Sequence, residues 1–159
     1  MQWHGTSISP LASSNKSFVP RSRAPLSDPR FLLDRSVGRY VVAEGMQADG
    51  FEVETLASLY GEQRAQEVKD EEWLQAAGTD GFVVITADSA IRRRPSEIAA
   101  VELYGVKMFC IANGHLTGPN QLALVRQHMP RILREARTSG PWIWSLSASA
   151  VKRVWPRAN

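Results

Sequence analysis

The sequence predicts an α/β fold, a three-layer α/β/α sandwich around a small and mainly parallel central sheet. Short apolar runs of strand length alternate four times with segments of helical period. Glycine or proline stands at most of the junctions between them. Because connections between parallel strands are short and right-handed, this alternation leaves few other topologies.

Composition indicates one soluble globular domain. The chain has 159 residues, of which 43% are hydrophobic and 22% charged, and these are ordinary values for a protein with a buried core. No apolar stretch approaches the ~20 residues of a membrane span, and the N-terminus lacks the apolar core of a secretory signal. The single cysteine, Cys110, excludes an intramolecular disulfide and suits a reducing compartment. We therefore expect a cytoplasmic location and no membrane partner.

The first elements follow an unpatterned N-terminus. Residues 1–28 are rich in Ser, Pro and Arg without periodicity, so we expect a flexible extension, followed by one domain over residues 29–159. The domain is expected to begin with a strand Phe31–Leu33, a helix within Gly38–Asp49, a strand Phe51–Leu56, a loop over 57–69 and a helix Asp70–Ala77. Gly50 and Gly78 are expected to stop the two helices.

The second half of the domain continues the alternation and closes it. It predicts a buried strand Phe82–Thr86, a helix Pro95–Tyr104 and a buried strand Met108–Ala112. An apolar stripe then predicts a long helix, made by Leu122, Val125, Met129, Ile132, Leu133 and Ala136. Pro130 should kink or restart that helix. The runs Trp142–Leu146 and Val151–Trp155 predict a C-terminal hairpin.

Acidic residues stand where these elements should converge. Asp34 and Asp88 each follow an apolar strand, and they lie side by side if those two strands are neighbours. Asp70 shares a helix face with the packing residue Trp73, and Glu97 belongs to the next helix. Two carboxylates about 4 Å apart repel by roughly 4 kcal/mol at an effective dielectric near 20. Such a cluster favours a hard divalent cation with oxygen ligands, Mg²⁺ or Mn²⁺.

Each acid also has a purely structural interpretation. Asp70 is a good helix N-cap, and Asp88 is a good turn residue. Asp34 could pair with the adjacent Arg35, and Glu97 could only complement the dipole of its helix. These alternatives stay open on the sequence alone.

Other chemistries are poorly supported. The chain has three histidines, and none follows one of the first three predicted strands, which disfavours a histidine-pair ribonuclease. The sequence contains no GxxxxGK[ST] loop, no GxGxxG fingerprint and no Cys/His zinc spacing. Cys110 lies inside an apolar run and is expected in the core.

Charge is distributed unevenly along the chain. The net charge of +3 combines an acidic centre, with 8 bases and 14 acids over residues 31–114, and basic segments on both sides of it. Basic segments of this kind favour an anionic partner such as nucleic acid, although they also serve solubility.

Three segments together resemble a known family. FLLDRSVGR, DEEWLQAAGTDGFVVITADSAIRRRPSE and GVKMFCIAN follow one another in the order and spacing of PIN-like domains. The chain is most similar to the toxin subgroup of VapBC-type toxin–antitoxin modules, over about residues 31–112. The resemblance implies a metal-dependent endoribonuclease toxin that cleaves RNA, and a cognate antitoxin that silences it. A homodimer is an open alternative for its oligomeric state.

The resemblance also implies site residues. The motif positions make Asp34, Asp70 and Asp88 catalytic and metal-binding. A fourth family acid is absent, because Asn113 and Gly114 follow the next strand, so Glu97, or else Glu72, is expected to substitute. RNA contacts are expected from five residues near these acids, Arg35, Thr86, Arg92, Arg93 and Arg94, because guanidinium groups suit phosphate and the threonine hydroxyl can hold a ligand or water.

Two rival functions remain at this stage. A PIN-like domain without the fourth acid could be inactive and serve only to bind a partner. A phosphorelay receiver also places acids after parallel strands, but it needs an acidic doublet and a lysine after a late strand. Lys107 instead precedes its strand.

Overall fold

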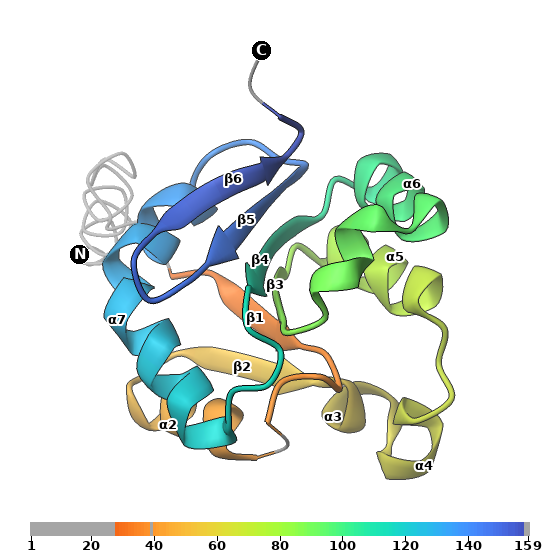
Figure 1. Ribbon diagram of the computed structural model, residues 1–159. Coiled ribbons are helices and arrows are strands. Elements are labelled where there is room, and N and C mark those ends of the chain that lie inside the picture. The colour runs from red at the N-terminus through yellow and green to blue at the C-terminus, as the bar shows by residue number, and fades with distance from the viewer. Residues whose placement is uncertain (1–27, 39, 158–159) are drawn as a thin grey trace, which may run out of the picture.

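The computed structural model describes residues 28–38 and 40–157, and it contains the predicted alternation of strands and helices (Figure 1). The strands are β1 Arg30–Leu33, β2 Glu52–Thr55, β3 Val83–Thr86, β4 Lys107–Ile111, β5 Trp142–Leu146 and β6 Val151–Trp155. The helices are α2 Val41–Ala48, α3 Leu56–Tyr60, α4 Glu62–Ala65, α5 Asp70–Asp80, the short 3-10 helix η3 Ser89–Arg93, α6 Pro95–Tyr104 and α7 Gly118–Ala136. Of the expected N-terminal extension, only Asp28 lies within the described residues.

The strands form one sheet in the order β2-β1-β3-β4-β5-β6. All neighbouring strands are parallel except β5 and β6, which form the antiparallel C-terminal hairpin. The strand order reverses at β1, so β1 and β3 are neighbours and their carboxyl ends meet. Sheets of this type bind ligands at such a reversal. The predicted adjacency of the two strands that precede Asp34 and Asp88 is therefore confirmed.

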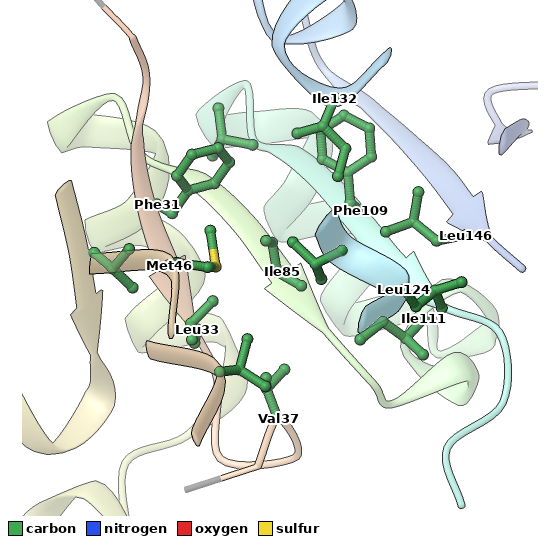
Figure 2. Packing of buried hydrophobic residues seen from close by; sticks show 14 of the residues in the cluster. Phe31, Leu33, Val37, Met46, Ile85, Phe109, Ile111, Leu124, Ile132 and Leu146 are labelled. Atoms are coloured by element: carbon green, nitrogen blue, oxygen red, sulfur yellow. The ribbon is translucent and has the colours of Figure 1, made fainter. Parts of the chain in front are cut away.

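Helices cover both faces of the sheet, and a separate hydrophobic core lies on each side (Figure 1). Within β1, Phe31 and Leu33 belong to the core beside α2 and α7, while Leu32 belongs to the core beside α5 and α6. Figure 2 shows the first of these cores, where side chains of adjacent strands such as Leu33, Ile85 and Ile111 pack together. Burial on both faces explains why β1, β3 and β4 are largely continuous apolar runs. The three-layer prediction is confirmed.

The segment 57–69, predicted as a loop, instead contains α3 and α4. α3 begins with a reciprocal cap in which the Thr55 hydroxyl accepts from the Ser58 backbone N–H at 3.1 Å. The Ser58 hydroxyl in turn accepts from the Thr55 N–H at 2.8 Å. The usual sequence signal for this cap has glutamate or glutamine at the fourth position, and serine replaces it here, so the pattern was missed.

α5 passes the predicted stop at Gly78 and ends at Gly81, which has φ of 76°. Gly78 lies inside the helix, where α5 and α6 come into close contact. A Cβ added there would lie 2.2 Å from the Tyr104 carbonyl oxygen. The glycine is needed for helix–helix contact and not for ending the helix, a distinction that depends on tertiary structure.

α7 is longer than its apolar stripe indicates. It begins after Thr117, whose hydroxyl accepts from the Asn120 N–H at 3.3 Å, and it continues through Pro130 as one helix. Pro130 is exposed, whereas Met129 and Ile132 on either side of it are buried against the sheet. Packing on this face holds the helix across the proline, and the predicted restart does not occur.

None of the helices in the described part of the chain has both the length and the apolar character required to cross a bilayer.

Gly78→Ala should destabilise the fold although alanine is normally the better helix residue. The added methyl group meets a backbone carbonyl that cannot rotate away, and such overpacking costs about 1–3 kcal/mol. Thermal unfolding of the full chain measures the effect. Gln75→Ala, an exposed position of the same helix, is the control and should change stability by no more than about 0.5 kcal/mol. A higher melting temperature for Gly78→Ala would contradict the close contact of α5 and α6.

Candidate acidic site

Four acids from four elements gather at the carboxyl ends of β1 and β3. Asp34 directly follows β1, Asp70 opens α5, Asp88 caps η3 and Glu97 lies in the first turn of α6. The Asp34 N–H donates to the Ile85 carbonyl at 3.3 Å, which continues the pairing of β1 with β3 beyond the last strand residue. Strand order thus positions the first acid, and the segments that follow β3 bring in two of the others.

Asp34 is only 8% exposed and is held by hydroxyl groups. Its Oδ1 accepts from the backbone N–H and the hydroxyl of Ser36, at 3.0 Å for the backbone donor. Its Oδ2 accepts from the Thr86 hydroxyl at 2.6 Å. Burial raises the pKa of Asp34, and the nearby Asp70 carboxylate adds to this, although the three hydrogen bonds oppose it. A cation beside Asp34 would favour its charged form.

Thr86 and Ser36 join the ends of β1 and β3 to each other. The Thr86 hydroxyl accepts from the Asp88 N–H at 3.0 Å, and the Ser36 hydroxyl accepts from the Ala87 N–H at 2.8 Å. Thr86 is fully buried, so its hydroxyl positions Asp34 and Asp88 and does not face RNA as was expected. Ser36 was missed by the sequence analysis. Its signal is a hydroxyl residue two positions after an acid, a common local hydrogen-bonding pattern.

Asp70 is oriented by its neighbours and does not cap the helix. The N-cap of α5 is Lys69, and no side chain makes a capping hydrogen bond there. Asp70 Oδ1 instead accepts from the indole N–H of Trp73 at 2.9 Å and lies 3.6 Å from Arg35 Nη1. Arg35 therefore pairs with Asp70 and not with Asp34. The capping interpretation of Asp70 and the pairing of Asp34 with Arg35 are both wrong.

Arg35 is also tied to the backbone that leads into α5. Its Nε donates to the Ala65 carbonyl at 3.2 Å, and its Nη2 donates to the Val68 carbonyl at 2.6 Å. A guanidinium fixed by two carbonyls and one carboxylate braces the site. This geometry supports the bracing of acids more than the RNA contact that was expected of Arg35.

Arg94 stands in the middle of the acidic cluster. Its Nη1 lies 3.7 Å from Asp70 Oδ2, 2.8 Å from Asp88 Oδ2 and 3.3 Å from Glu97 Oε1. One guanidinium group thus contacts three carboxylates from three elements. The side chain is 43% exposed, so it reaches the cluster from the solvent side. Arg94 was expected to contact RNA, but in this structure it neutralises the acids.

Glu97 takes part in the cluster although helix position alone would explain an acid there. Its carboxylate accepts from the Ser96 hydroxyl at 2.6 Å and from Arg94 at 3.3 Å. Burial acts to raise the pKa of Glu97, but the hydrogen bonds from Ser96 and Arg94 outweigh it and the pKa is lowered. The carboxylate is charged and only 8% exposed. Glu72, the other candidate for the fourth acid, is held at the surface by Arg64 at 2.6 Å.

The donor chemistry suits a divalent metal, but a cation of the protein is already present. Within residues 28–38 and 40–157, no three His, Cys, Asp or Glu side chains are arranged as a metal site. Asp70, Asp88 and Glu97 surround Arg94 instead of one shared point, and Asp34 binds hydroxyl groups. Carboxylate oxygens are the ligands that Mg²⁺ and Mn²⁺ prefer. A metal could therefore use these acids once Arg94 has moved away.

The remaining candidates are not nucleophiles or bases of this site. Cys110 is buried in β4, and burial raises the pKa of its thiol to about 12, so the thiolate form is negligible near neutral pH. His128 Nε2 contacts the Ser147 carbonyl at 2.6 Å, beside the C-terminal hairpin. Trp73 is completely buried, as expected of a core residue. Arg92 and Arg93 are the last two residues of η3, the helix that begins directly after Asp88.

Comparison with known proteins shows the family to which the chain belongs. The model of a family described as "PIN like domain" matches residues 29–113, the segment that contains all four acids. The chain is also 30% identical over 123 residues to a protein of Mycobacterium tuberculosis (strain ATCC 25618 / H37Rv) named "Putative ribonuclease VapC45". That alignment covers 77% of this chain and 89% of the relative. No solved structure gives a significant match. The chain therefore belongs to the PIN-like domain family, and it is a relative of VapC-type ribonucleases.

Proposed function

We propose that the protein is a metal-dependent endoribonuclease that acts as the toxin of a toxin–antitoxin module. The observation that carries this proposal is the gathering of Asp34, Asp70, Asp88 and Glu97 at the reversal of strand order. The similarity to a protein named as a VapC ribonuclease supports RNA as the substrate. A cognate antitoxin and a cytoplasmic location are parts of the same proposal.

The four acids would hold Mg²⁺ or Mn²⁺, with Glu97 in place of the missing acid after β4. Asn113, which occupies that position, is exposed, and its side-chain oxygen accepts from the His115 N–H at 3.0 Å. When bound, a divalent ion of this kind supplies Lewis-acid activation of water and neutralises charge on the phosphate.

The chain's own residues would prepare the acids for this task. Ser36 and Thr86 fix the carboxylate of Asp34 on the sheet side, and Trp73 and Arg35 fix that of Asp70 on the helix side. Oriented ligands of this kind lose less entropy when they bind an ion, and partners of metal ligands typically contribute 10–100-fold in affinity or activity. Ser36, Thr86 and Trp73 are positioning residues in this proposal.

Arg94 would act as a temporary counterion. Without it, three carboxylates of the cluster would repel one another, by roughly 4 kcal/mol for each pair at 4 Å and an effective dielectric near 20. Its partly exposed side chain can turn outward when a divalent cation binds, and a guanidinium released there can pair with a phosphate. The same residue would therefore stabilise the resting protein and contact the substrate.

A second candidate is an inactive PIN-like domain that only binds a partner protein. The observation in its favour is that Arg94 already balances the charge of three acids, while no acid follows β4. The receiver alternative has no such support. Lys107 lies at the start of β4, where its Nζ donates to the Ala136 carbonyl at 2.8 Å. It is therefore at the amino ends of the parallel strands, and the acids are at the carboxyl ends.

Asp88→Asn should abolish RNA cleavage because it removes a charged ligand while keeping a similar shape. We expect at least a ~100-fold loss of Mg²⁺-dependent cleavage by the purified chain. Mutation of a residue that only hydrogen-bonds to a metal ligand already lowers affinity or activity by about 10–100-fold. Expression in a bacterium should show the same contrast, with growth slowed by wild type only. Asp80→Asn, an exposed acid at the end of α5, is the matched control and should keep wild-type activity. Equal activity of Asp88→Asn and wild type would exclude the nuclease proposal.

Arg94→Gln should lower the melting temperature without metal and increase the stabilisation that Mn²⁺ provides. The variant leaves three carboxylates without their shared cation, so an added divalent ion relieves more repulsion. We expect at least ~10-fold tighter Mn²⁺ binding in a titration followed by electron paramagnetic resonance.

The control for Arg94 is Arg126→Gln, which breaks an ion pair with Asp49 on the surface between α7 and α2. It should leave Mn²⁺ binding unchanged. Unchanged or weaker Mn²⁺ binding by Arg94→Gln would show that Arg94 and the metal do not compete for the same acids.

A further inference from the structure

A groove of uncompensated positive charge lies between η3 and the last strand of the sheet. It is lined by Arg92, Lys152, Arg153, Val154 and Arg157, and we call it the β6 groove. A second hollow adjoins it, lined by Ser89, Arg92, Arg93, Cys110, Ala112, Ser145 and Val154. Arg92 and Val154 belong to both. The two hollows therefore form a continuous path along this side of the molecule.

Sheet pairing explains how residues 60 positions apart in the chain come together. Cys110 of β4 pairs with Ser145 of β5, and Ser145 pairs with Lys152 of β6. Paired residues project from the same face of a sheet, so the Lys152 side chain lies on the face that carries Cys110. This is the face with the core beside α5 and α6, to which Ile91 of η3 also belongs. Figure 1 shows β5 and β6 extending the sheet past β4, between α7 and α6.

The β6 groove contains no acid. Its four ionisable residues are all cations, and among the described residues none of them makes an ion pair or hydrogen bond through its side chain. Several other arginines of the domain are neutralised, for example Arg64 by Glu72 and Arg126 by Asp49. Arg153 pairs with Trp144, which packs against the opposite core, so its side chain projects from the other face of the sheet. Arg92, Lys152 and Arg157 therefore supply the positive potential of the hollow, which an anionic partner relieves.

The path begins beside the acidic site. Ser89, which lines the second hollow, directly follows Asp88, and Arg93 directly precedes Arg94. The path then leads past Arg92 to Lys152 on β6. A strand of RNA with one phosphate at the acids would therefore meet a series of cations on the neighbouring phosphates.

Charge on an edge strand also has a simpler purpose, since lysine and arginine on a sheet edge prevent pairing with other chains. That purpose accounts for Lys152 and Arg153 on β6. It does not account for Arg92, which lies on η3 and not on the edge strand, yet lines the same groove. The gathering of cations from two separate elements points to a ligand.

We propose that the β6 groove binds the phosphate backbone of single-stranded RNA and guides it to the acidic site. This inference rests on the proposed function, because it assumes an RNA substrate. Phosphate contacts hold a strand independently of its bases, so the groove contributes affinity and alignment while sequence preference must arise elsewhere. The C-terminal hairpin, which lies outside the part matched to the family model, thereby gains a substrate-binding role.

The test measures RNA binding as a function of salt. Arg92→Gln with Lys152→Gln is introduced into the full chain carrying Asp88→Asn, which prevents cleavage, and binding to a labelled single-stranded RNA is followed by fluorescence anisotropy. Each lost phosphate contact lowers the slope of log K against log salt by about 0.7 for single strands. We expect the slope to fall by about 1.4 and the affinity to fall roughly 10- to 30-fold at 0.1 M salt.

A control with the same change in charge separates the groove from general electrostatics. Arg134→Gln with Arg137→Gln removes two cations at the end of α7. Arg137 lines a hollow with Lys107 at the amino ends of the parallel strands, away from the acids. That control should keep at least about 80% of the parent slope, because distant charges act on RNA only through weak, screened long-range effects. In the active chain, the groove variant should raise KM with little change in kcat, since it loses binding and not chemistry.

The outcomes distinguish this inference from the proposed function. If the groove variant and the control have the same slope as the parent while wild type still cleaves RNA, the groove is overturned and the nuclease proposal stands. If the groove variant binds RNA like the parent but no longer binds the cognate antitoxin, the groove serves the antitoxin and the inference is overturned. If wild type neither binds nor cleaves RNA, the proposed function and the groove both fail.

Discussion

The contact of one guanidinium group with three carboxylates is the interaction on which the site depends. Asp70, Asp88 and Glu97 come from separate elements, and Arg94 Nη1 lies within 3.7 Å of each. Like charges at such separations repel one another, so a cation among them stabilises the packing of α5, η3 and α6. In the proposed function, a divalent metal takes the place of that cation. A metal that replaces Arg94 therefore gains the attraction of the acids and must offset the loss of the arginine.

The fold supplies the other half of this constraint. Parallel strands covered on both faces have their carboxyl ends at the same end of the sheet. The reversal of strand order at β1 leaves space for a ligand between the segments that follow the strands. Asp34 is buried at that point, with its carboxylate satisfied by Ser36 and Thr86 instead of a cation. Burial and the Asp70 carboxylate both raise the pKa of Asp34. A divalent ion beside Asp34 would favour its charged form.

The sequence predicted the strands well, and with them the positions of Asp34 and Asp88 after β1 and β3, because both depend on local patterns. A buried parallel strand is a short apolar run, and the residue after it is read directly. What failed depends on contacts between distant segments. Gly78 resembles a helix stop until Tyr104 is known to pack against it, and Pro130 resembles a break until Met129 and Ile132 are known to be buried. Arg94 could not be distinguished from Arg92 and Arg93, since the three are adjacent and only the fold separates their directions.

That separation gives the arginine run two different purposes. Arg94 faces the acids and is neutralised, whereas Arg92 faces the β6 groove, where every ionisable neighbour is a cation. Arg92 lies inside η3, whereas Arg94 follows the helix in extended backbone, with φ of −94° and ψ of 120°, so the chain changes direction between the two arginines. Three consecutive residues thereby connect an anionic site to a cationic path. In our proposal, a polyanion that lies on the path brings one phosphate to the acids around Arg94.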